Sequence, residues 1–522
     1  MKRFFALALA CMMFVGLMAG CSDNASTTSS PDAGTSTDGP KTDAEPTTAP
    51  AEEMESIVFT FPATKVVDGI QMVEEEINKI IEPKLKVHVT LEGISMANYS
   101  EQVNLMVSSG EQIDLMGFLG NYSTWLSRNQ FKPLNELVDT YGQGIREAVG
   151  DNMIKATTSD GTIYAVPNNN GKAHVLNIVI REDLLEASDI STDGLKQAKN
   201  FEEYLENMDE LGNIFAQLKA ANPDMVMVVP GGNGVMSFTY PPFIDNLSDY
   251  YGVIRAEDAD ELKVSNLFAS EEFATLLDYA HDWFQKGYIL QDAATTQEAQ
   301  STYLSSDRTT GYFISGEEGQ AEQITTQTGK PVVAIKLLEP YINTGVVNST
   351  GFGISATSAH EAAAMKFLNE SYVNAEMANL LAWGIEGTHY EVQDDGTIDF
   401  PEGVTAENTS YGLNMDWFFG NQFLTYIWGK GRDVTIYERL DANNKHASFS
   451  PAMGFSYDST VVRNELTALG NTFNEYMPGL MTGTLDPATE LPKFLEALDR
   501  AGIDVVIEEK QRQLDAWAET NT

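Results

Sequence analysis

The sequence predicts an α/β protein with an open sheet, long enough for two domains. Strand-like and helix-like segments alternate from Ile57 onward, and such an alternation implies parallel strand pairing through right-handed crossovers. The chain has 522 residues and its folded part begins near residue 55, which leaves enough length for two domains of ordinary size.

The first three elements follow from hydrophobic periodicity. Residues 57–62 are an apolar and β-branched run that predicts a buried strand. Residues 69–81 predict a helix that Pro83 ends, and residues 85–91 alternate as a strand. The apolar face of this helix consists of Ile70, Val73, Ile77 and Ile80.

The next elements repeat the unit and lead to a loop. Residues 99–108 predict a helix, residues 113–118 a strand, and residues 119–125 the loop behind it. Open α/β sheets bind ligands at the carboxyl ends of their strands, so this loop is expected at a ligand site.

Three later segments predict helices. Residues 358–361 (Ser-Ala-His-Glu) form a capping-box pattern in front of residues 362–372. Residues 491–501 and 506–517 predict two helices that close the chain.

The N-terminus has the layout of an export signal. Lys2 and Arg3 precede an apolar run over residues 4–18 that is too short to span a bilayer comfortably. Residues 17–21 (Leu-Met-Ala-Gly-Cys) resemble a bacterial lipobox, which implies removal of residues 1–20 and lipidation of Cys21 at the extracellular face of the cytoplasmic membrane. A plain secretory signal with an incidental cysteine is the alternative.

Residues 21–54 are predicted to form a lipidated cysteine and a disordered tether. Ser, Thr, Pro, Ala, Gly and acidic residues dominate this stretch, and without apolar periodicity it cannot bury enough surface to fold.

Composition excludes several classes of function. The second cysteine, Cys11, lies inside the signal, so no disulfide, Cys-ligated zinc or catalytic thiol is expected in the mature chain. The formal net charge of −44 argues against nucleic acid as a partner, although a highly charged solvated surface also explains it.

Catalytic signatures are missing from the sequence. It contains no phosphate-binding GxxxxGK[ST] loop, no GxSxG elbow and no GxGxxG dinucleotide turn. His360 and Glu361 begin a zinc-protease pattern that Ala364 breaks. A glycosidase carboxylate pair stays open as an alternative, because acidic residues are abundant.

Aromatic and amide residues gather in five loops instead. Sugar rings stack on Trp and Tyr, and their hydroxyls bind amides and carboxylates, so this mixture favours a carbohydrate cleft. The alternative is that each aromatic residue packs in the core. The five groups are residues 120–125, 164–170, 240–243, 381–390 and 416–422.

Three motifs carry a resemblance to a known family. They are residues 160–167 (Asp-Gly-Thr-Ile-Tyr-Ala-Val-Pro), residues 179–185, and residues 350–358 followed by 362–368. In this order the chain resembles the family 1 extracellular solute-binding proteins of ABC importers, which include maltose-binding protein. From Trp383 onward it resembles the C-terminal extension of a lipoprotein subgroup that binds large oligosaccharides.

The resemblance implies a periplasmic-binding-protein-like fold with two α/β lobes and a ligand cleft between them. Lobe one is expected over residues 55–170 and 311–345, and lobe two, with a C-terminal helical extension, over residues 171–310 and 346–522. Crossing strands are expected near residues 169–174, 308–312 and 343–353, where glycines suit a hinge.

The resemblance and the five loops together predict the site residues and partners. The expected partners are an oligosaccharide, the membrane permease subunits and the membrane itself through the lipid; no cofactor or metal is expected, and the protein is expected to be a monomer. The predicted ligand-binding residues are Asn121, Tyr122, Trp125, Asn169, Tyr240, Glu317, Trp383, Glu386, His389, Trp417 and Asn421.

The predicted function is therefore a non-catalytic receptor that captures an oligosaccharide by hinge closure and delivers it to a permease. Three alternatives stay open: an extracellular glycoside hydrolase, a receptor of the same fold for peptides or another polar solute, and a surface adhesin.

Overall fold

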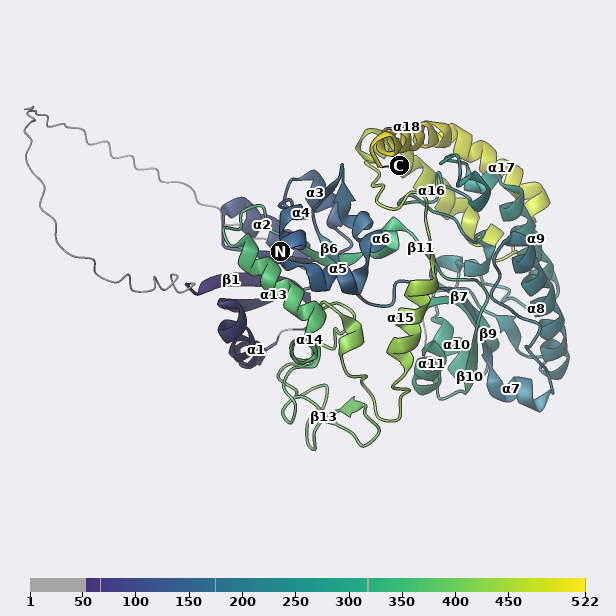
Figure 1. Ribbon diagram of the computed structural model, residues 1–522. Coiled ribbons are helices and arrows are strands. Elements are labelled where there is room, and N and C mark those ends of the chain that lie inside the picture. The colour runs from purple at the N-terminus through teal and green to yellow at the C-terminus, as the bar shows by residue number, and fades with distance from the viewer. Residues whose placement is uncertain (1–52, 66, 174, 317–318, 522) are drawn as a thin grey trace, which may run out of the picture. The chain divides into compact units, whose positions relative to one another are not determined.

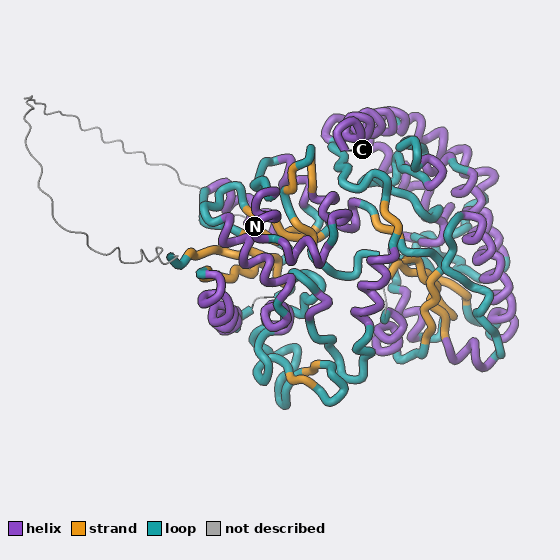
Figure 2. The backbone as a smooth tube through the Cα atoms, in the orientation of Figure 1, coloured by secondary structure: helices purple, strands orange, loops and turns teal. Residues whose placement is uncertain are grey.

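The computed structural model describes residues 53–521 except 66, 174, 317 and 318. The predicted signal, Cys21 and nearly all of the predicted tether lie outside the described residues. Glu52–Thr522 form one compact unit. Within it the longer strands fall into two separate groups (Figure 2).

The first sheet has the strand order β2-β1-β3-β12-β6. Strand β1 pairs in parallel with both β2 and β3, as the alternation predicted, whereas β12 pairs antiparallel to β3. The strands are β1 (Glu55–Ala63), β2 (Val87–Ser95), β3 (Leu115–Leu119), β12 (Thr350–Ile354) and β6 (Val166–Pro167). The helices of this half include α1 (Ile70–Leu85), α2 (Tyr99–Ser109), α13 (Glu361–Val373) and α14 (Ala375–Trp383).

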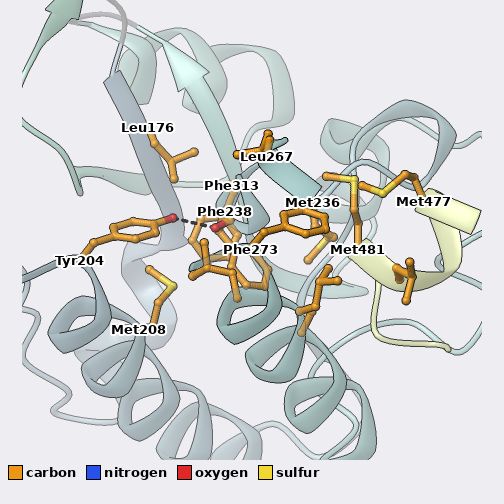
Figure 3. Close-up of a cluster of buried hydrophobic side chains, with 14 of the residues drawn as sticks. Leu176, Tyr204, Met208, Met236, Phe238, Leu267, Phe273, Phe313, Met477 and Met481 are labelled. Carbon is orange, nitrogen blue, oxygen red and sulfur yellow. Dashed lines mark hydrogen bonds between the residues drawn. The ribbon is translucent and has the colours of Figure 1, made fainter. Parts of the chain in front are cut away.

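The second sheet has the strand order β10-β7-β9-β8. Its strands are β7 (Val175–Arg181), β8 (Val226–Val228), β9 (Thr309–Gly316) and β10 (Val332–Lys336). Helices of this half include α8 (Phe201–Ala221), α9 (Glu271–Gln285), α10 (Gln300–Ser305) and α11 (Gln320–Thr328). In the core between the sheet and α8, the hydroxyl of Tyr204 donates to the carbonyl of Phe238 at 2.9 Å (Figure 3).

Shorter elements connect these layers, and three helices follow at the C-terminus (Figure 1). The short helices are α3 (Tyr122–Ser127), α4 (Asn135–Tyr141), α5 (Gln143–Val149), α6 (Asp151–Ile154), α7 (Glu182–Ala187), α12 (Thr344–Val347) and α15 (Ile436–His446). The short strands are β4 (Thr158–Ser159), β5 (Thr162–Ile163), β11 (Tyr341–Ile342), β13 (Glu391–Val392), β14 (Ile398–Asp399) and β15 (Ser448–Phe449). The C-terminal helices are α16 (Arg463–Met481), α17 (Pro487–Ala501) and α18 (Ile503–Asn521).

The predicted lobe boundaries need correction. Strands β9 and β10 belong to the second sheet, although residues 311–345 were predicted in lobe one. Strand β12 pairs in the first sheet, and side chains of α13 and α14 join the core of that half, although these residues were predicted in lobe two. Lobe one therefore holds the first sheet with residues up to about 171 and from about 342 to 447, and lobe two holds the rest.

Two glycines that suggested a hinge have a different role. A Cβ at Gly311 would lie 2.0 Å from the carbonyl oxygen of Val179, and one at Gly351 would lie 2.5 Å from that of Val166. Both glycines allow neighbouring strands to approach each other within a sheet, so they mark close packing and not crossings between lobes.

Two helix ends also differ from prediction. Helix α1 continues past Pro83 to Leu85 and ends at Lys86, whose backbone is left-handed with φ 56°. Helix α13 begins at Glu361 with His360 as its N-cap. The Ser358 hydroxyl donates to Asp114 Oδ1 at 2.6 Å and accepts from the N–H of His360 at 3.1 Å, so it caps no N–H of the helix itself. Long-range contacts override the local capping pattern here.

Three chain segments connect the lobes: residues 168–173, residues 337–342 and residues 447–455. The second and third pair with each other through β11 and β15. Asn444, on α15, fastens the first: its Oδ1 accepts from the backbone N–H of Lys172 (2.9 Å) and Ala173 (3.0 Å), and its amide donates to the carbonyl of Asn170 (2.6 Å). The first of these segments, residues 168–173, is called the first crossing below.

The C-terminal helices complete the core of lobe two. Buried side chains from α16, α17 and α18 pack in the same cluster as α8 and α9. Lys510, on α18, is fully buried; its Nζ lies 2.7 Å from Asp249 Oδ1 and donates to the carbonyl of Gly252 at 2.9 Å. Burial lowers the pKa of Lys510, against the opposing effect of Asp249.

Replacing Asp249 with asparagine is expected to lower the free energy of unfolding by roughly 3 kcal/mol, because the buried amine of Lys510 loses its carboxylate. Chemical denaturation at pH 7 measures this loss. Lys510→Met is the control: it removes the buried charge and leaves the Asp249 carboxylate, which is 23% exposed, so it is expected to cost less. A larger loss for Lys510→Met than for Asp249→Asn would contradict this account.

No helix among the described residues is both long and apolar enough to cross a membrane.

Candidate ligand-binding cleft

Two cavities meet beside the first crossing. One has a volume of about 290 Å³ and the other about 430 Å³, and Trp417 and Gln422 line both. Together they are called the Trp417 cleft.

The first cavity lies against the crossing itself. Its lining combines Asn170, Gly171 and Lys172 with Val346, Ser349 and Thr350 at the start of β12, besides the two shared residues. The carbonyl of Ser349 accepts from the N–H of Gly120 at 2.6 Å, so the loop behind β3 reaches the edge of this cavity.

The second cavity joins the two lobes. Ser315 and Gly316 at the end of β9, with Gln320 and Gln323 on α11, line it from lobe two. Its other lining residues are Asp416, Trp417, Gln422, Ile427, Arg432, Ile436, Tyr437 and Leu440. A molecule in this cavity touches both lobes at once.

The backbone around Trp417 is held by the first crossing. The side-chain amides of Asn168 and Asn170 both donate to the carbonyl oxygen of Trp417, the second at 2.8 Å. The indole is half-buried and packs edge-on against Phe418 at 5.8 Å between ring centroids. Part of the indole ring is therefore accessible from the cavities, while hydrogen bonds from the first crossing hold the backbone of Trp417 in place.

Two amide oxygens in the cleft receive no hydrogen bond from the described residues. Oδ1 of Asn170 in the first cavity and Oε1 of Gln320 in the second are buried, and no described residue donates to either. A buried acceptor without a donor is costly, so each of these atoms favours a hydroxyl or N–H brought by a ligand.

Asp416 is the one carboxylate among the described residues that line the two cavities. Its Oδ2 accepts from the hydroxyl of Tyr437 at 2.6 Å and from the amide of Gln422 at 2.7 Å. Burial, and then the charge of Asp416, raise the pKa of Tyr437 well above its usual value, so this phenol stays protonated.

Three of the predicted residues come together at the cleft. Trp417 lines it. Asn169 and Asn421 are buried behind it, where the Asn169 amide donates to Asn421 Oδ1 at 3.0 Å and the Asn421 amide donates to the carbonyl of Tyr372 at 3.2 Å. These two asparagines fasten the loop to the crossing, so their side chains are already engaged by the protein.

The prediction is wrong for the aromatic residues behind β3. Trp125 is 0% exposed and packs against Tyr99 and Phe131, and Tyr122 is buried and stacks on Phe131 at 5.8 Å. Both lie on α3, whose apolar side covers the first sheet. Asn121 stands in front of this helix, and its Oδ1 accepts from the N–H of Leu119 at 3.1 Å.

The prediction is also wrong for the group around Trp383, whose residues do not line this cleft. Trp383 is buried against Trp428, and its indole N–H donates to the carbonyl of Tyr426 at 3.1 Å. His389 is buried, where its Nδ1 accepts from the N–H of Ile385 at 2.9 Å, and burial lowers the pKa of its imidazole. Glu386 is exposed and lines a different cavity of about 680 Å³.

Two predicted residues remain. Tyr240 stacks on Tyr250 at 4.5 Å and packs against the core of lobe two. Glu317 lies outside the described residues. The prediction missed Asn170 and Gln422, which stood inside two of the five loops, and it missed Lys172, Gln320, Gln323 and Arg432, which no motif marked.

The described residues hold no group of three or more His, Cys, Asp or Glu side chains that could bind a metal ion.

A two-sheet molecule with three connecting segments and a polar, aromatic cleft beside them has the architecture of a receptor that encloses a solute between lobes. Residues 71–378 match the model of bacterial extracellular solute-binding proteins, and the chain belongs to this family. Residues 451–519, which include α16, α17 and nearly all of α18, match a domain of unknown function.

Individual relatives agree with the family. A carbohydrate ABC transporter substrate-binding protein of Streptococcus pneumoniae serotype 4 is 27% identical over 465 residues, which cover 86% of this chain and 88% of the relative. The crystal structure of the N-glycan transport solute-binding protein NgtS from S. pneumoniae matches with a TM-score of 0.72 at 24% identity, covering 90% of this chain and 100% of NgtS. NgtS in complex with Man1GlcNAc matches with a TM-score of 0.61 at 25% identity, covering 89% and 100%.

Proposed function

We propose that this protein is the substrate-binding component of a carbohydrate ABC importer and that it holds an oligosaccharide in the Trp417 cleft. The lobes close on the sugar, and a membrane permease accepts it from the closed form. Cys21 carries the lipid that keeps the protein at the outer face of the membrane, and residues 22–54 are the tether.

The observation that carries this proposal is the chemistry of the cleft. A half-buried indole lies beside two buried amide oxygens that have no donor from the described residues. A sugar can interact with both kinds of group, because its C–H faces stack on an indole and its hydroxyls donate hydrogen bonds to amide oxygens. Since the second cavity is lined from both lobes, a sugar bound there stabilises the closed arrangement.

The named relatives support the choice of ligand. One is a carbohydrate transporter component and another was crystallised with Man1GlcNAc. The two NgtS structures match this chain with TM-scores of 0.72 and, for the Man1GlcNAc complex, 0.61.

Glycoside hydrolysis is the weaker alternative. It requires two carboxyl groups about 5–9.5 Å apart across the sugar. The described lining of the Trp417 cleft offers Asp416, and that carboxylate is already hydrogen-bonded to Gln422 and Tyr437.

Isothermal calorimetry against a panel of oligosaccharides, including mannose–N-acetylglucosamine disaccharides, tests the proposal. We expect binding without turnover, a raised melting temperature and, in small-angle X-ray scattering, a smaller radius of gyration with ligand than without. Released products would favour the hydrolase. Binding of peptides in place of every sugar, or no change in scattering on saturation, would overturn the proposal.

A further inference from the structure

The first cavity contains an unusual lysine. Three lysine or arginine side chains among the described residues are more than nine-tenths buried: Lys172, Arg181 and Lys510. Arg181 pairs with Asp183 and Asp307, and Lys510 pairs with Asp249. Lys172 has no carboxylate within ion-pair distance among the described residues, so it alone of the three lacks a counter-charge.

The contacts of Lys172 are few and neutral. Its Nζ donates to Asn168 Oδ1 at 2.8 Å and to Thr350 Oγ1 at 3.1 Å. An ammonium group has three N–H donors, so one stays available on the side chain that lines the first cavity. A buried amine in this position favours a partner with negative charge, because an unpaired buried charge is costly.

We infer that the Trp417 cleft accepts an oligosaccharide that carries a carboxylate, and that this carboxylate binds Lys172 Nζ in the first cavity. The inference rests on the proposed function and narrows its substrate class to acidic sugars. Stacking on Trp417 and the open acceptor of Asn170 hold the sugar next to the same cavity.

The surroundings of Lys172 make the charge of the ligand decisive. Among the described residues, no other titratable side chain lines the first cavity. Two elements pack around this cavity. The loop at Trp417 carries Asp416, whose carboxylate accepts hydrogen bonds from Gln422 and Tyr437. Helix α15 contacts the first crossing through Asn444. The net charge of −44 repels anions at long range, but salt screens that repulsion beyond about 8 Å and screens a buried contact much less.

Binding is expected to take up a proton. Burial lowers the pKa of Lys172 to about 7, so above pH 7 the empty cleft holds a neutral amine. A bound carboxylate favours the charged form and raises this pKa, so ligand and proton bind together. Affinity for an acidic sugar is therefore constant below about pH 7 and falls as the pH rises, by up to about tenfold per unit.

Calorimetry on matched ligand pairs tests the inference. Trigalacturonate is compared with its methyl ester, and 3′-sialyllactose with lactose, at pH 6.5, 7.5 and 8.5. We expect one acidic member to bind at least tenfold more tightly than its neutral counterpart at pH 6.5, with the advantage shrinking at higher pH. Buffers of different ionisation enthalpy should report about one proton taken up at pH 8.5; which pair responds identifies a uronic or a sialic acid.

Two variants distinguish a role of Lys172 in ligand binding from a role in folding. Lys172→Met is expected to lose the preference for the acidic member while it still binds neutral sugars. Lys510→Met, at the other buried lysine, is expected to keep the preference. The pH profile and proton uptake of the wild-type protein decide the question even if Lys172→Met does not fold.

Two results overturn the inference in different ways. If neutral sugars bind but no acidic member gains affinity or takes up a proton, the substrate class is wrong and the proposed function stands. If no acidic or neutral sugar binds, both fall together.

Discussion

Replacing Trp417 with alanine is expected to weaken oligosaccharide binding at least 100-fold, equivalent to about 3 kcal/mol. Trp417 lines both cavities of the cleft, so its loss removes the stacking surface and opens the space between them. The fold is expected to survive, because the indole is only half-buried and the first crossing holds the backbone of residue 417 through its carbonyl oxygen. Calorimetry with the tightest ligand of the panel measures the change.

Trp517→Ala is the matched control for this experiment. Trp517 is also a half-buried tryptophan, but it packs against Phe455 and lines neither cavity. It is expected to lose some stability and to keep its affinity. If Trp417→Ala binds within a few-fold of the wild-type protein, the cleft has been placed wrongly.

The second large effect is expected at Trp125, where substitution should lower stability and leave the affinity for the ligand unchanged. Trp125→Ala should lower the free energy of unfolding by about 3–5 kcal/mol, because it empties a fully buried site among Tyr99 and Phe131. The fraction of molecules that stays folded should bind the ligand normally. Denaturant titration gives the stability, and calorimetry scaled to the folded fraction gives the affinity.

Trp125→Phe refines this expectation. The indole N–H of Trp125 has no acceptor among the described residues, so phenylalanine loses volume but no hydrogen bond. It should cost clearly less than alanine. A Trp125→Ala protein that is as stable as the wild type and fails to bind would restore Trp125 as a ligand contact.

These two tryptophans mark the limit of sequence-based prediction. Trp125 and Trp417 both stand in loops rich in aromatic and amide residues, and composition alone gives them the same role. Their environments differ because α3 turns its apolar side onto the first sheet, whereas the loop of residues 416–422 runs along the first crossing. That difference depends on contacts between residues far apart in the chain.

The fold was predictable where the signal is local. Strands β1, β2 and β3 and helices α1 and α2 follow from periodicity and lie within a few residues of their predicted positions. The division into lobes was not predictable from the sequence, because the composition of an apolar strand such as β9 is compatible with either sheet. Only its pairing with β7 and β8 decides, and pairing leaves no trace in the sequence of one strand.

The fastening of Trp417 to the first crossing has a kinetic consequence. Asn168 and Asn170 bond Trp417, the proposed stacking residue, to the first crossing, which would bend in the proposed closure of the lobes. The same hydrogen bonds then influence both the binding and the release of the sugar. A change that strengthens binding therefore also lengthens the residence time of the sugar. A transporter needs release as much as capture, and this coupling sets a ceiling on useful affinity.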